Sequence, residues 1–113
     1  MQEKIAGGWF WGLGAISEVE LAFYSLTDKK YYSKMFSQAM EVVSLSGNIG
    51  FKEGEMVIHC HGVFSDKELQ TVGGHINKLI VAATLEVFLT IMSQISRRYS
   101  EDIGLNLLLP KEE

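Results

Sequence analysis

Met56-Val-Ile-His-Cys-His-Gly-Val-Phe64 and, after a polar loop, Val72-Gly-Gly-His-Ile76 are the two segments of this 113-residue chain that say most about its fold and chemistry. Successive side chains of a β-strand point to opposite faces, so His59 and His61 lie on one face. The other face of the first segment is apolar and suits a core. A hairpin-like return of the chain then brings His75 alongside. All three histidines of the chain therefore gather on one face, which is a metal-site pattern.

The composition predicts a single domain, residues 1–113, because 47% hydrophobic content in a chain of this length supports one core but not two. The net charge of −4 gives no electrostatic attraction to nucleic acid or to an anionic membrane. One cysteine cannot form an intramolecular disulfide, and no signal peptide is recognisable. The longest apolar run, residues 79–92, is too short to span a bilayer comfortably. We expect a cytoplasmic protein without a membrane partner.

Alternation of apolar and polar residues predicts an antiparallel, strand-dominated domain. Gly12 and Gly14 indicate a bend or bulge in the first strand, because strand glycines mark such places. The last predicted strand is apolar on both faces, so either a helix layer or a subunit interface must cover it. No long stretch shows a clear helical period. The predicted strands cover residues 9–16, 18–25, 31–36, 38–49, 56–64 and 75–92.

Imidazole nitrogens on adjacent strands can converge on one ion at metal–nitrogen distances of about 2.0–2.1 Å. Neutral imidazole suits zinc, copper, nickel or iron, whereas calcium and magnesium prefer oxygen ligands. Three protein ligands leave a coordination position for water or another ligand, while a structural zinc site is normally closed by a fourth residue. The three histidines thus predict a transition-metal site that is open on one side.

The sequence leaves the fourth ligand undecided. A thiolate binds zinc strongly, but alternation turns Cys60 toward the core and away from the histidines. Glu86 is an auxiliary candidate, although its parity along the last strand differs from that of His75. Asp66 and Glu68, in the loop between the two opening segments, can also reach inward.

An ordered set of motifs resembles the plants-and-prokaryotes-conserved (PPC) domain, prokaryotic type, over about residues 7–109. The motifs are Glu41-Val-Val-Ser-Leu-Ser-Gly-Asn-Ile49, His59-Cys-His61, Gly73-Gly-His75 and Thr84-Leu-Glu-Val87, with Gly12-Leu-Gly-Ala-Ile16 before them and Gly104-Leu-Asn-Leu107 after them. The resemblance implies an α+β domain, mainly an antiparallel sheet with a flanking helix, that assembles as a homotrimer. It also implies that His59, His61 and His75 bind a metal, typically zinc. Family members usually carry a further strand and helix before the glycine-rich strand; here that unit is largely absent, so we expect exposed apolar surface.

The function that this resemblance implies is DNA binding associated with transcription. In the plant members an Arg-Gly-Arg-type segment outside the domain contacts DNA, and this chain has no such segment. Arg97-Arg98 and Lys29-Lys30 are isolated pairs that we interpret as solvated surface. The alternatives are a metal-dependent enzyme or small-molecule binder of unknown substrate, and a homotrimeric scaffold with a structural metal. The sequence names no substrate and favours binding over catalysis.

Overall fold

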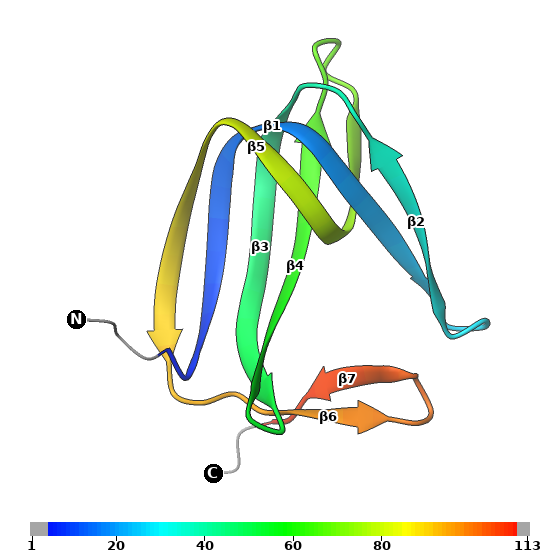
Figure 1. Cartoon of the computed structure of the whole chain (residues 1–113), viewed down its shortest axis with the longest axis vertical. Coiled ribbons are helices and arrows are strands. Elements are labelled where there is room, and N and C mark those ends of the chain that lie inside the picture. Colours follow the sequence, from blue (N-terminus) through cyan, green and yellow to red (C-terminus); the bar gives the residue numbers. More distant parts are fainter. Residues whose placement is uncertain (1–4, 111–113) are drawn as a thin grey trace.

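All regular structure in the described part of the chain, residues 5–110, is β-strand. Figure 1 shows this computed structural model, in which seven strands follow one another along the chain. The strands are β1 (Gly7–Ser25), β2 (Lys30–Phe36), β3 (Met40–Lys52), β4 (Glu55–Ser65), β5 (Thr71–Met92), β6 (Arg97–Ser100) and β7 (Leu105–Leu108).

The five long strands form one antiparallel sheet in the order β2-β1-β3-β4-β5, and this sheet closes on itself. Closure arises because β5 has two partners. Its first residues, Thr71–His75, pair with β4, and the remainder pairs with β1 along almost the full length of both strands. The two longest strands therefore bend over the top of the molecule, as Figure 1 shows. The beginning of β5 lies beside the end of β4 because the short loop of residues 66–70 joins them as a hairpin.

The bend of β1 coincides with its glycines. The register between β1 and β3 shifts between Gly12 and Gly14, and the register between β1 and β5 shifts between Gly14 and Ile16. The prediction of a bend or bulge at these glycines is thus confirmed. The backbone of β5 approaches so closely there that a Cβ on Gly14 would stand 2.2 Å from the carbonyl oxygen of Thr84. Glycine is required at this position by contact with backbone, which cannot rotate out of the way.

The expectation of an α+β domain with a flanking helix is wrong for the described chain, which is all-β. The helix was implied by the family resemblance, whereas the residues themselves alternate with the period of a strand and show no helical period. Residues 5–110 contain no helix, and hence none that could cross a membrane. The predominantly antiparallel strand architecture was predicted correctly. The polar stretch after β5 was not recognised as structured, yet it supplies β6, which pairs with β7 in a separate hairpin.

The core lies inside the curve of the sheet, where side chains from β1, β3 and β4 meet. It is small for a chain of this length, and Ile16, Val19 and Phe64 are its fully buried members. The cluster of buried apolar residues comprises Phe10, Ile16, Val19, Leu21, Met40, Val42, Leu45, Ile49 and Phe64.

The second half of β5 is apolar on both faces, as predicted, but no other described segment covers either face well. On the inner face Leu89, which pairs with buried Phe10, remains 41% exposed. On the outer face Phe88 is 56% exposed and stacks on the equally outward Trp11, with ring centroids 4.8 Å apart. Exposed apolar surface was expected from the sequence, and the sheet shows it on both sides.

Substitution Gly14→Ala tests the close approach of β1 and β5. We expect a loss of about 3 kcal/mol in the free energy of unfolding, because the new methyl group would collide with the backbone at Thr84. Urea denaturation followed by circular dichroism measures the loss. The control is Gly54→Ala, where φ is +82° and no atom lies within 4 Å of the added Cβ, so that only backbone strain of about 1 kcal/mol is added. Equal losses in the two variants would refute the steric argument.

Candidate metal centre

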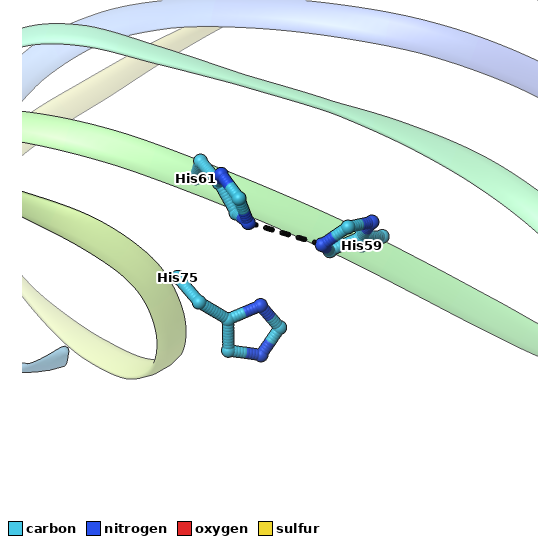
Figure 2. Close-up of side chains that lie close together, drawn as sticks. All are labelled: His59, His61 and His75. Atoms are coloured by element: carbon cyan, nitrogen blue, oxygen red, sulfur yellow. Dashed lines mark hydrogen bonds between the residues drawn. The ribbon is translucent and has the colours of Figure 1, made fainter. Parts of the chain in front are cut away.

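The closed sheet places the three histidines on adjacent strands. His59 and His61 lie on β4 with the same parity, and His61 is the direct cross-strand partner of His75 on β5. This pairing arises because the chain turns back through residues 66–70, so that β5 begins antiparallel to β4. Figure 2 shows the three rings turned toward a common space, two from one strand and one from its neighbour.

The ligand atoms of these side chains converge. One ring nitrogen from each of His59, His61 and His75 lies within 4.8 Å of the other two. The Nε2 atoms of His59 and His61 are 3.1 Å apart, and the ring centroids of the three pairs are separated by 4.8, 5.3 and 5.5 Å. Two nitrogens that bind one tetrahedral ion at about 2.0–2.1 Å lie about 3.3 Å apart. The spacing on β4 is therefore suitable for shared coordination, and a ring nitrogen of His75 lies within 4.8 Å of both.

Burial and neighbouring charge favour the neutral form of His59 and His75, which is the form that binds metal. Burial lowers the pKa of His59, and the nearby His61, Arg97 and His75 lower it further. Burial also lowers the pKa of His75, with a smaller contribution from His61. In addition, Nδ1 of His75 is buried without a hydrogen-bond partner. A buried ring nitrogen without a hydrogen-bond partner is stabilised when a metal ion or another ligand binds to it.

Cys60 lies away from the histidines, as alternation predicted. Its side chain packs against the hydrophobic core, and burial raises the pKa of its thiol to about 11. The thiolate, which is the form that binds zinc, is therefore scarce at neutral pH.

The acidic residues considered from sequence lie outside the cluster. The Oδ1 atom of Asp66 accepts hydrogen bonds from the backbone N–H groups of Glu68 and Gln70, which fixes its carboxylate within the loop. Glu86 pairs with Leu13 of β1, on the far part of β5. Strands β1 and β3 lie between it and β4 in the order of the sheet. Among residues 5–110, the group that could hold a metal ion consists of the three histidines without a carboxylate.

Three polar residues beside the histidines were not found from sequence. Asn48 is the cross-strand partner of His59 on β3, and its Oδ1 accepts a hydrogen bond of 2.7 Å from Nη2 of Arg97 on β6. The interpretation of Arg97 as a solvated residue is therefore wrong, although its neighbour Arg98 is exposed. Tyr31 of β2 packs against the His75 ring with centroids 4.8 Å apart. The alternation of residues 44–48 indicated a polar face, but no local signal places β6 or β2 next to it.

The sequence of this chain matches a known domain family. The model of the Plants and Prokaryotes Conserved domain, abbreviated PCC or PPC, matches residues 1–93, which is most of the chain. This protein belongs to the PPC domain family. No curated protein matches the sequence significantly.

Several solved structures share the fold. A protein of Bacteroides thetaiotaomicron, described as a candidate DNA-binding protein, is 32% identical with a TM-score of 0.89, over 92% of this chain and 73% of its own. A metal-containing protein of Archaeoglobus fulgidus is 27% identical with a TM-score of 0.84, over 94% of this chain and 76% of its own. A PPC protein of Pyrococcus horikoshii is 25% identical with a TM-score of 0.86, over 96% and 76%.

Proposed function

We propose that this PPC-domain protein holds a divalent transition metal, zinc in the first instance, on His59, His61 and His75. The observation that carries the proposal is the convergence of three imidazoles from two paired strands, with one ring nitrogen of each within 4.8 Å of the others. The lowered pKa values of His59 and His75 and the unpartnered Nδ1 of His75 support it. The similar protein of Archaeoglobus fulgidus is described as metal-containing, which is consistent with it.

Such a site suits ligand binding better than catalysis. Three protein ligands leave zinc at least one open position, and the hollow beside His59 and His61 is lined by Ser46, Gly47 and Asn48. A metal-dependent enzyme would also need a general base near the metal, and no carboxylate of residues 5–110 belongs to the cluster. We therefore rank a metal-dependent binding protein, located in the cytoplasm, above an enzyme of unknown substrate.

Metal analysis of His61→Ala tests the centre. We expect the purified wild-type chain to retain about one zinc ion and the variant to lose most of it, measured by inductively coupled plasma mass spectrometry. Cys60→Ala is the control and should keep its zinc, because the thiol faces the core. Lowering the pH through about 6 should release the ion, since protons then compete for the imidazoles. Unchanged zinc content in His61→Ala would exclude this coordination.

We further propose that the chain assembles as a homotrimer through the outer face of β1 and β5. Trp9, Trp11 and Leu13 project outward from β1 and are 40–45% exposed, beside the exposed Phe88 of β5. Contiguous apolar surface of this kind is rare on monomers and is typical of subunit interfaces. Symmetric copies of one chain are the simplest way to cover it, and a trimer agrees with the family resemblance.

Trp11→Glu tests the assembly, because it places a charge in the centre of the apolar face. Light scattering after gel filtration should give three times the chain mass of 12.7 kDa for the wild type and a smaller species for the variant. The matched control is Leu69→Glu, which changes a side chain that is 81% exposed on the loop between β4 and β5. A monomeric wild type, or a variant that assembles as the wild type does, would contradict the proposed interface.

Direct DNA binding is the second candidate, because the Bacteroides thetaiotaomicron protein is described in those terms. The net charge of −4 opposes it, and Arg97 already hydrogen-bonds Asn48 and Asn106. A gel-shift assay with duplex DNA at about 50 and 200 mM salt tests whether the chain binds DNA directly, since phosphate contacts weaken steeply as the salt concentration rises. We expect no shift at either concentration; a complex at low salt that disappears at high salt would overturn this ranking.

A further inference from the structure

Arg97 carries a positive charge that no acidic side chain of the described residues 5–110 neutralises. Its Nη1 donates to the backbone carbonyl of Asn106 and its Nη2 to the side-chain amide oxygen of Asn48, both at 2.7 Å. Both acceptors are uncharged, and no carboxylate of residues 5–110 pairs with the guanidinium. The Nε atom is buried and has no hydrogen-bond partner. A half-buried cation that has only neutral partners is stabilised by a bound anion.

The position of Arg97 is set by the way β6 crosses the end of β3. The backbone N–H of Phe51 on β3 donates to the carbonyl of Ile95 just before β6, which holds the two segments together. The arginine side chain then runs along β3 toward the histidines. Its Nε lies over Gly50, 3.6 Å from the place where a Cβ would stand, and its guanidinium reaches Asn48 two residues further along. The charge therefore lies on the histidine-bearing face of the sheet.

Asn48 connects this charge to the metal centre. It is the direct cross-strand partner of His59, and with Ser46, Gly47, His59 and His61 it lines the hollow beside the imidazoles. Because its Oδ1 accepts the hydrogen bond from Arg97, its Nδ2 group remains as a donor. The Ser46 hydroxyl is a further hydrogen-bonding group of the same hollow. A divalent ion on three neutral imidazoles, added to Arg97, would give this face three positive charges.

We propose that the hollow beside His59 and His61 binds a small carboxylate, held by the bound metal and Asn48 and attracted by the positive charge of Arg97, the hydrogen-bond partner of Asn48. A carboxylate supplies the two things this face lacks: negative charge and planar acceptor oxygens, which match an amide donor. One oxygen fills the open position of the metal and the other accepts from the polar side chains. Inorganic phosphate shares the charge but not the planar shape. The inference rests on the proposed metal site.

Cobalt substitution makes the binding visible. The full chain is loaded with Co²⁺, and sodium acetate or inorganic phosphate is added at constant ionic strength maintained with perchlorate. We expect the visible absorption bands of the metal to change saturably with acetate, and at lower concentration than with phosphate. Arg97→Gln should weaken the apparent acetate affinity by about tenfold or more, because it removes the positive charge that is hydrogen-bonded to Asn48. Arg98→Gln, which alters the exposed neighbour on the same strand, should leave it unchanged.

Asn48→Asp is the second variant, because it keeps an acceptor for Arg97 and so preserves the link between β3 and β6 while replacing the donor by a negative charge. It should bind Co²⁺ and lose the acetate response. A Co²⁺ spectrum that acetate does not change, a response to phosphate alone, or equal acetate affinities in wild type, Arg97→Gln and Asn48→Asp would overturn the carboxylate site and leave the metal site standing. Failure of the wild type to bind Co²⁺ would overturn both.

Discussion

The pairing of β1 along both of its edges is the constraint on which the structure depends. One edge holds β3 and then β2, and the other holds β5 from Gly7 to Ala22. A strand that is paired this way must bend without losing its hydrogen bonds, and the bend falls where Gly14 lets the two backbones approach. The short loop 66–70 places the beginning of β5 beside β4, and the pairing with β1 then carries the rest of β5 across to close the sheet. The closed sheet and its core follow from these pairings of β1, and the histidine cluster follows from the β4–β5 hairpin.

Much of the sheet and of the candidate site could be predicted because both depend on the parity of residues along strands. Parity placed His59 and His61 on one face and Cys60 in the core, and it identified β5 as apolar on both sides. The partner of His61 across the loop was predicted from a short hairpin-like return, which is a local feature. Where residues that are close in the sequence determine the structure, the alternation of side chains along a strand is sufficient to predict it.

The remainder depends on contacts between segments that are distant in the sequence. Arg97 reaches Asn48 across 49 positions, and Tyr31 reaches His75 from a different edge of the sheet. Nothing in the composition around Arg97-Arg98 distinguishes the half-buried arginine from the exposed one. The helix expected from the family resemblance shows the opposite problem, because it was assigned from relatives although no segment here has a helical period. Two kinds of prediction therefore failed: contacts between segments that are far apart in the sequence, and the helix that was inferred from the family resemblance.

The closed path of the sheet also fixes the order in which the molecule can form. The hairpins β1–β2 and β3–β4 join segments that are close along the chain, whereas Gly7 meets Met92 only after β5 has folded back over everything before it. Pairings of such separation are slow to form. His75 does not depend on that late step, because the β4–β5 hairpin joins it to His61 through the short loop of residues 66–70. An ion on the three imidazoles would therefore bind before the sheet closes and stabilise the hairpin from which β5 starts. Metal supply would then act on folding yield as well as on the finished site.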